Sequence, residues 1–290
     1  MISVIQKIQS NIDDVVKYIL EDDIFGKNEV SIIRKNTKDV IVLPSQTNCK
    51  MGCKFCHLTG TTRSANNFTA EWFIEIVKFI IKMENLTIKP ILISFMGAGE
   101  PLLNSKNILE AIIKLYEDVP EIRFALATMI PNHKLFDEVV NWMKSKPSIS
   151  LKIHLSLHGM FSRREIIDHY ISAWDAIARL QEYNDETNNP IEYHYALIDG
   201  INDSIEELTE FRDWIIPYTD IGLKTTTVKF LTLSEVNGFK KTRRTKEEIL
   251  NLFKNIIVEF YDPPGRDIGS SCGMFDRSIY MKKEDKDDKN

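Results

Sequence analysis

Cysteine is scarce in this sequence, which has four cysteines among 290 residues. That number is far too small for a scaffold held together by disulfides. Long apolar runs are lacking as well: no stretch of about eighteen apolar residues occurs, so no transmembrane helix is predicted. The first residues, MISVIQKIQSNIDDVVKYILEDD, carry acidic side chains and no small-residue cleavage site, so we expect no signal peptide. These absences predict a soluble, cytoplasmic protein.

A strong excess of one charge is also absent. The 37 lysines and arginines against 42 aspartates and glutamates give a net charge of −5, which argues against broad non-specific binding to a polyanion. Hydrophobic residues make up 43% and charged residues 27% of the chain. This composition is typical of globular proteins and excludes disordered, collagen-like and coiled-coil classes.

Strand-like and helix-like apolar patterns alternate along most of the chain. Residues 3–20 have near-helical apolar spacing and predict an amphipathic helix. Two short strands are predicted next, at Glu29–Arg34 and Asp39–Leu43. Further strands are predicted at Pro90–Met96, Ile122–Ala127, Ile149–Leu157, Ile191–Leu197 and Leu223–Leu231. Helices are predicted at Ala70–Met83, Ser105–Tyr116, Lys134–Lys144, Ile171–Tyr183, Ser204–Ile216 and Lys246–Glu259.

This alternation predicts an α/β fold with a mostly parallel sheet and helices packed outside it. Periodicity alone does not decide between an open sheet and a partial barrel. We expect three segments: a helix and β-hairpin extension at residues 1–44, the α/β domain at 45–281, and a charged, disordered tail at 282–290.

Three of the four cysteines lie within eight residues. Cys49, Cys53 and Cys56 have the spacing C-x3-C-x2-C, which suits three ligands of one [4Fe–4S] cluster and leaves the fourth iron open to a small molecule. A structural zinc site is the alternative, but it needs four protein ligands. His57 is poorly placed as the fourth, and Cys272 is far along the chain. Three unrelated thiols in a reducing cytoplasm are the remaining interpretation.

A glycine-rich turn follows the strand predicted at Pro90–Met96. Its sequence is Gly97-Ala98-Gly99-Glu100-Pro101. Glycines let a backbone come close to a ligand, and a carboxylate attracts an ammonium group. Taken alone, the same turn is equally well explained as structural.

The cysteine spacing, with Phe55 before the third cysteine, resembles the radical S-adenosylmethionine (SAM) superfamily. That resemblance implies that the amino and carboxylate groups of SAM occupy the open iron, and that the glycine-rich turn binds the SAM ammonium group. It also implies a partial (β/α)6 barrel.

A longer segment of the sequence resembles one particular family within this superfamily. The segment FMGAGEPLLN at 95–104 closely resembles the RlmN/Cfr family, radical SAM methyltransferases acting on adenine C2 or C8 in ribosomal RNA and, for some members, transfer RNA. Ser156–His158, Asp199–Asp203 and Ser271–Gly273 resemble further family segments in the same order. The resemblance spans roughly residues 29–280. It implies the following SAM-binding residues: Gly99, Glu100, Thr128, Ser156, Leu157, His158 and Ser234.

The resemblance gives Cys272 a role in catalysis. One SAM methylates this cysteine, and a second SAM yields a 5′-deoxyadenosyl radical that abstracts hydrogen from the S-methyl group, so that the carbon radical adds to adenine. Glu29 aligns with the glutamate that removes the ring proton, which requires a partly desolvated carboxylate. An exposed strand residue is the alternative interpretation of Glu29.

One family cysteine, which resolves the covalent adduct, is replaced here by Val42. Either an external thiol does this work or the reaction differs from that of the family. A radical SAM oxidoreductase or cross-linking enzyme on a peptide or small molecule, without methyl transfer, is therefore the second hypothesis. A non-catalytic or zinc-binding interaction protein is the third.

The expected partners are an adenine-containing RNA or a related small molecule, and an external electron donor such as flavodoxin or ferredoxin. We expect a monomer with no membrane contact. Arg163-Arg164 and the basic run Lys240–Arg244 are candidate phosphate contacts, with solvated loops as the alternative. His154 and His158 share one face of their strand with Ser156. His158 is the better candidate for the SAM pocket, and core hydrogen bonding is the alternative for both histidines.

Overall fold

The computed structural model describes residues 2–86, 88–119, 121–218 and 227–282. The chain divides into two compact units. The first unit contains residues 1–52, 56–126 and 264–290, and the second contains residues 53–55 and 127–263. In the described part of the chain, no helix is long and apolar enough to cross a membrane.

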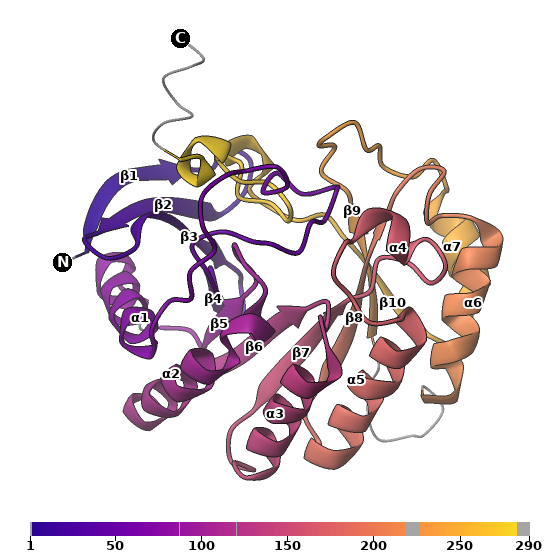
Figure 1. The fold of residues 1–290 in the computed structure, drawn as a ribbon, viewed down its shortest axis with the longest axis horizontal. Helices are drawn as coiled ribbons and strands as arrows, with labels where there is room; N and C mark the ends of the chain where they lie inside the picture. Colours follow the sequence, from indigo (N-terminus) through magenta and orange to yellow (C-terminus); the bar gives the residue numbers. More distant parts are fainter. Residues whose placement is uncertain (1, 87, 120, 219–226, 283–290) are drawn as a thin grey trace. The chain divides into compact units, whose positions relative to one another are not determined.

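The first unit is built on a mixed sheet. Its strands are β1 (Ser3–Gln9), β2 (Val15–Asp22), β3 (Gly26–Arg34), β4 (Asp39–Leu43), β5 (Ile91–Phe95) and the start of β6 (Arg123–Thr128). Strands β1 to β4 pair antiparallel in chain order, and β4, β5 and β6 then pair in parallel (Figure 1). The sheet therefore changes from hairpins to β/α repeats at β4.

The helix predicted at residues 3–20 is wrong, because this segment forms β1 and β2. The two strands pair with each other from Ser3↔Glu21 to Gln9↔Val16. Ser10 turns the chain between them, since its hydroxyl accepts hydrogen bonds from the backbone N–H groups of Ile12 and Asp13. Val15–Leu20 are all buried, on both faces of β2, which explains why the apolar positions did not alternate as in a half-exposed strand.

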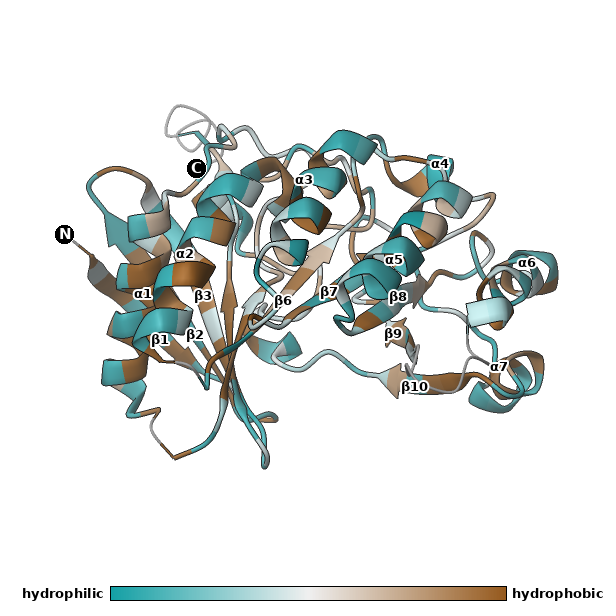
Figure 2. Cartoon of the chain, turned by 90° about the horizontal axis from the view of Figure 1, so that it is seen from below, coloured by the Kyte–Doolittle hydropathy of each residue, from teal (hydrophilic) through white to brown (hydrophobic). Residues whose placement is uncertain are grey.

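Two helices pack on the parallel part of the first unit. Helix α1 (Ala70–Glu84) begins after Thr69, whose hydroxyl accepts from the Trp72 N–H, and it ends at Asn85 in a left-handed conformation. The short 3-10 helix η1 (Pro101–Asn104) leads into α2 (Ser105–Asp118). Figure 2 shows apolar stretches along the strands and mixed polar and apolar surfaces on α1 and α2, as expected of amphipathic helices.

The end of the chain returns to the N-terminal strands of the first unit (Figure 1). It carries the 3-10 helices η3 (Arg266–Ile268) and η4 (Arg277–Tyr280). The Asp267 carboxylate accepts hydrogen bonds from the Ser10 hydroxyl and the Asn11 N–H, each at 2.8 Å. The Gly265 N–H donates to Asp13 at 2.8 Å. These contacts fix the segment that contains Cys272 within the first unit.

The second unit is a parallel α/β sheet. Its strands are β7 (Leu151–Ser156), β8 (Ile191–Leu197), β9 (Thr227–Thr232) and β10 (Ile257–Tyr261), which pair in parallel in this order. Its helices are α3 (His133–Lys144), α4 (Arg163–Ile166), α5 (Ala173–Thr187), α6 (Ile205–Ile215), η2 (Ile216–Tyr218) and α7 (Lys246–Leu252).

Most predicted elements are confirmed with small shifts of their ends, and β4 and β8 have the predicted bounds. The helix predicted at Lys246–Glu259 is partly wrong: α7 ends at Leu252, and β10 begins at Ile257. Asn255 has a positive φ of 74°, which breaks the helix, and the β-branched residues after it pair with β9. The start of the strand predicted at Leu223–Leu231, and the predicted tail after residue 282, lie outside the described residues.

Strands β4 to β9 are each followed along the chain by a helix, which agrees with the predicted β/α repeats. The division into an extension at 1–44, a barrel at 45–281 and a tail stays a prediction.

Candidate functional site

The cysteine loop follows β4. In the first unit Cys49 and Cys56 are half-buried, whereas Cys53 is buried and belongs to the second unit. Asn48 shapes the start of the loop: its amide donates to Thr61 Oγ1 at 3.0 Å and to the Arg63 carbonyl at 2.6 Å, and its side-chain oxygen accepts from the Cys49 N–H. The position of Cys49 is therefore fixed by the segment that follows the loop.

The thiols of this loop lie in surroundings that disfavour a bare charge. Burial raises the pKa of Cys49 to about 11 and that of Cys56 to about 12. Hydrogen bonds from the backbone N–H groups of Met51 and Gly99 lower the pKa of Cys49 and so oppose this rise. The backbone N–H of Leu58 does the same for the pKa of Cys56. Thiolates at these positions need a cation for stability. Sulfur ligands with N–H donors around them fit an iron–sulfur cluster.

The glycine-rich turn lies beside the cysteine loop in the first unit. Gly99 has φ +102°, and a Cβ added to it would lie 2.7 Å from Gln46 N and closer still to Ser45 Oγ, so no other residue fits. The next residue, Glu100, is buried. One of its oxygens accepts from the Leu102 N–H at 3.0 Å and caps η1, while its own N–H donates to Gln46. The Glu100 charge is one of the groups that raise the pKa of Cys49.

Gly99→Ala should lower the free energy of unfolding by about 3 kcal/mol, because it combines a positive φ with a backbone clash. Gly200→Ala is the matched control: Gly200 also has a positive φ, of +68°, but its added Cβ meets no atom within 4 Å. We expect that control to lose about 1 kcal/mol. Denaturant unfolding measures both, and equal losses would show that the contact with Ser45 and Gln46 does not matter.

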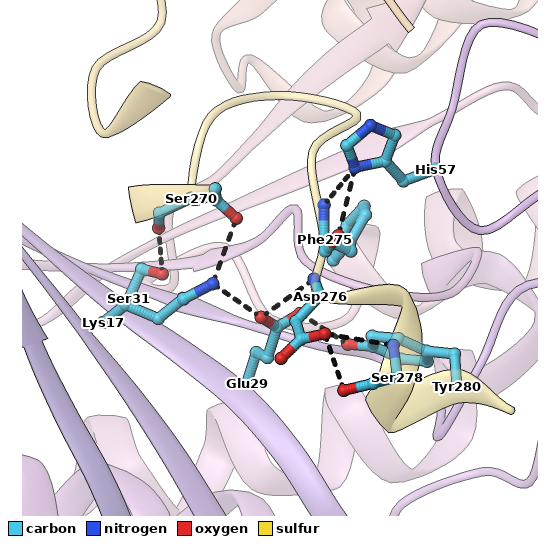
Figure 3. Close-up of polar contacts among 10 residues, drawn as sticks. Lys17, Glu29, Ser31, His57, Ser270, Phe275, Asp276, Ser278 and Tyr280 are labelled. Carbon is cyan, nitrogen blue, oxygen red and sulfur yellow. Dashed lines mark hydrogen bonds and ion pairs between the residues drawn. The ribbon is translucent and has the colours of Figure 1, made fainter. Parts of the chain in front are cut away.

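Glu29 lies on β3 and is buried, so its interpretation as an exposed strand residue is wrong. Figure 3 shows its carboxylate among three donors. Lys17 Nζ lies 2.9 Å from Oε1, the Asp276 N–H donates to Oε1 at 3.3 Å, and the Tyr280 hydroxyl donates to Oε2 at 3.1 Å. Burial raises the pKa of Glu29 although the Lys17 charge opposes the rise. This is the partly desolvated carboxylate that a general base requires.

The stability of the protein should depend on pH through Glu29. Its folded-state pKa is raised above the ordinary value of 4.5, so Glu29 stabilises the fold fully below 4.5, and this contribution is lost as pH rises through the folded-state pKa. The melting temperature of the wild type should therefore fall relative to that of Glu29→Gln over this range.

Glu71→Gln is the control for this pH dependence. Glu71 is fully exposed, and hydrogen bonding to its own backbone N–H lowers its pKa, so the control should change slightly in the opposite direction. A constant difference between wild type and Glu29→Gln across the range would contradict the assignment.

Cys272 is exposed on the C-terminal segment, and His57 holds this segment against the cysteine loop. The backbone N–H of His57 donates to the Gly273 carbonyl at 2.9 Å. The backbone N–H of Phe275 donates to Nδ1 of the His57 ring at 3.1 Å (Figure 3). Arg277 adds a hydrogen bond to the His57 carbonyl at 2.6 Å. The charge of the Cys272 thiolate also raises the pKa of Cys56.

The structure thus brings the Cys272 segment to Cys56 within the first unit. The sequence showed His57 only as a poor zinc ligand, because nothing local indicates a contact more than two hundred residues away.

The other predicted SAM-binding residues belong to the second unit. Thr128, Leu157, His158 and Ser234 are buried, and Ser156 is half-buried at the end of β7. His158 Nδ1 accepts from the Ala196 N–H at 2.9 Å, and burial lowers the pKa of His158 to about 3, so its ring is neutral. Thr128 Oγ1 accepts from the Ile130 N–H at 2.9 Å. Their roles toward SAM stay predictions.

Arg163 was a candidate phosphate contact, but it is almost fully buried. Its guanidinium donates to the carbonyls of Ser156 and Leu157 and, at 2.6 Å, to that of Met129. Arg163 therefore supports the strand end that carries Ser156–His158. A buried arginine that satisfies backbone carbonyls has no signature in the local sequence.

Solved structures with similar folds were found. A radical SAM methyltransferase from Sphaerobacter thermophilus has a TM-score of 0.76 and 20% identity, and the match covers 95% of this chain and 81% of that one. Streptococcus suis SuiB, bound to its precursor peptide SuiA, has a TM-score of 0.55 and 16% identity, over 80% of this chain and 50% of SuiB. The predicted α/β fold, a partial (β/α)6 barrel, is confirmed. The cysteine loop follows β4 of this fold.

Curated relatives are similar over most of the chain, whereas no family model matches it. A probable dual-specificity RNA methyltransferase RlmN from Clostridium botulinum is 27% identical over 295 residues, which cover 96% of this chain and 81% of the relative. A protein of the same name from Thermotoga neapolitana is 28% identical over 295 residues, covering 94% and 79%. The chain is thus similar over most of its length to RlmN-type radical SAM methyltransferases.

Proposed function

We propose that this protein is a radical SAM methyltransferase that methylates an adenine carbon in RNA, with Cys272 as the methyl carrier. The observation that carries the proposal is the position of Cys272: its segment is held by His57 directly beside Cys56, and Cys272 is an exposed residue of that segment. The names of the curated relatives favour this activity over an oxidoreductase, a cross-linking enzyme or a non-catalytic protein.

In this proposal Cys49, Cys53 and Cys56 hold the [4Fe–4S] cluster, which when reduced supplies the electron for cleavage of SAM. Gly99 and Glu100 of the first unit bind SAM: Gly99 lets the backbone approach, and Glu100 attracts the ammonium group. The SAM-binding residues proposed in the second unit are Thr128, Ser156, Leu157, His158 and Ser234.

Cys272 and Glu29 carry the steps on the protein itself. The Cys272 sulfur accepts a methyl group and presents it to the adenine ring. Glu29 accepts the ring proton, which its buried environment favours because burial raises its pKa. Lys17 and Tyr280 orient the Glu29 carboxylate.

Val42 replaces the cysteine that would resolve the covalent adduct. It lies half-buried on β4, where it pairs with Ser31 of β3. Release of product is therefore assigned to an external thiol. The enzyme acts in the cytoplasm as a monomer and receives electrons from a flavodoxin or ferredoxin.

The test is anaerobic incubation of the cluster-loaded protein with SAM and a reductant, followed by peptide mass spectrometry. We expect the Cys272 peptide to gain one methylene group. With adenine-containing RNA and an added thiol, 5′-deoxyadenosine and S-adenosylhomocysteine should accumulate together with methylated adenine. Formation of 5′-deoxyadenosine alone, with unmodified Cys272, would overturn the proposal in favour of chemistry without methyl transfer.

A further inference from the structure

Two histidines and a glutamate converge on β7 and β8 of the second unit. His154, Glu192 and His194 are all buried. His154 Nδ1 lies 2.8 Å from His194 Nε2, which lies 2.6 Å from Glu192 Oε1, and His154 Nδ1 lies 3.3 Å from the same oxygen. Three atoms that carry lone pairs thus form a closed triangle.

The strand register explains this convergence. Glu192 and His194 are two residues apart on β8 and share one face, and His154 of β7 is the parallel partner of Glu192. The residue between them, Tyr193, points the other way, since its hydroxyl is bonded to Gln181 of α5. The triangle therefore lies on the face of the sheet opposite α5.

Hydrogen bonds alone do not satisfy the triangle. If His154 Nδ1 and His194 Nε2 both carry hydrogens toward the carboxylate, two N–H groups face each other at 2.8 Å. If His194 Nε2 is bare, its lone pair faces the Glu192 oxygen at 2.6 Å. If His154 Nδ1 is bare, the hydrogen of that ring is on Nε2, a buried nitrogen with no hydrogen-bond partner among the described residues. Each assignment therefore leaves a polar atom repelled or unpartnered, and a cation bound to all three atoms removes the repulsion between them.

We propose that His154, Glu192 and His194 bind a divalent transition-metal ion such as Zn²⁺ or Fe²⁺. Two imidazoles and a carboxylate on one face of a metal are a recognised donor set for these ions. Ligand atoms on bonds of about 2.1 Å lie about 3 Å apart at one face of an octahedron, close to the observed separations.

Two lysines face the same carboxylate. Lys152 forms an ion pair with Glu192 Oε2, and Lys229 Nζ lies 2.9 Å from Oε1. Lys229 also lies 3.2 Å from Glu259, whose carboxylate is half exposed. A metal ion and Lys229 therefore compete for Oε1, and the ammonium group has Glu259 as its other partner. Lys152 orients the carboxylate through the remaining oxygen.

This inference is independent of the proposed methyl transfer, because the donors are nitrogen and oxygen rather than the cysteine sulfurs. The test uses the anaerobic, cluster-loaded protein, which is equilibrated with Zn²⁺, desalted and analysed for zinc and iron by mass spectrometry. We expect one zinc per chain in addition to the cluster iron. His154→Ala and His194→Ala should lose the zinc and keep the iron. His133→Ala, at an exposed histidine of the same unit, should keep both.

The zinc affinity of Lys229→Met distinguishes a metal site from an ion-pair network that binds no metal. This measurement also serves if the histidine variants fold poorly. Removing a positive charge beside Oε1 should tighten zinc binding by about tenfold or more. The proposal is overturned if the wild type retains no zinc beyond background. It is also overturned if the histidine variants keep the zinc, or if Lys229→Met weakens binding.

Discussion

Cys272→Ala should abolish methyl transfer while the protein still cleaves SAM reductively to 5′-deoxyadenosine. Alanine has no sulfur to receive a methyl group, whereas the three cysteines of the cluster loop are unchanged. The substitution should cost little stability, because Cys272 is exposed and the backbone bond from His57 to Gly273 remains. Methylated adenine should fall below detection, and 5′-deoxyadenosine formation should stay within about threefold of the wild type.

Two control variants make this result specific. Cys272→Ser keeps the size of the side chain but replaces the thiol by a weak nucleophile, so it should behave as the alanine variant does. Cys56→Ala removes a proposed iron ligand, and both SAM products should then be lost. Methylated RNA from Cys272→Ala would show that the methyl group does not pass through this residue.

Lys17→Met should destabilise the protein by about 3–5 kcal/mol near neutral pH. Lys17 is buried, and its Nζ lies 2.9 Å from the equally buried Glu29 carboxylate. Among the described residues, the variant leaves that carboxylate with the Tyr280 hydroxyl and the Asp276 N–H as its hydrogen-bond donors. The loss should shrink at lower pH, where Glu29 becomes protonated and no charge stays uncompensated.

A double variant tests this explanation. Lys17→Met combined with Glu29→Gln should recover most of the lost stability, because neither charge then remains buried. Lys114→Met is the surface control: Lys114 and Glu110 form an ion pair at 3.0 Å, but both side chains are nearly half exposed, so the loss should be below about 0.5 kcal/mol. Urea unfolding of the cluster-loaded protein measures the wild type, Lys17→Met, Glu29→Gln, the double variant and Lys114→Met. Additive losses in the double variant would contradict a coupled pair.

The Lys17–Glu29 pair also links stability to the proposed catalysis. Its partners Asp276 and Tyr280 lie on the same C-terminal segment as Cys272. Lys17 itself donates to the Gly269 carbonyl, and Ser31 contacts Ser270 by its hydroxyl (Figure 3). Loosening this pair should therefore release the segment that presents Cys272. Methyl transfer in Lys17→Met should fall more than SAM cleavage does.

Local patterns predict the helices and most strands well, because caps and apolar spacing within each segment decide its conformation. Helices α1, α5, α6 and α7 begin at Ser or Thr residues whose hydroxyls accept a backbone N–H, a signal visible in the sequence. Residues 3–20 have near-helical apolar spacing but form strands, because their conformation is not decided locally. Strand β2 is buried on both faces, and its pairing with β1 and β3 decides its conformation rather than the spacing of its apolar residues.

The sequence by itself determined the cofactor class. The spacing of Cys49, Cys53 and Cys56 indicates an iron–sulfur cluster, and the glycine-rich turn at Gly99 indicates a ligand site. Each of these signals lies within a few consecutive residues. Only the tertiary structure decided the burial of Glu29 against Lys17, the hold of His57 on the Cys272 segment, and the triangle of His154, Glu192 and His194. These contacts join residues on different strands and segments, and the pairing of strands and the return of the C-terminus bring them together.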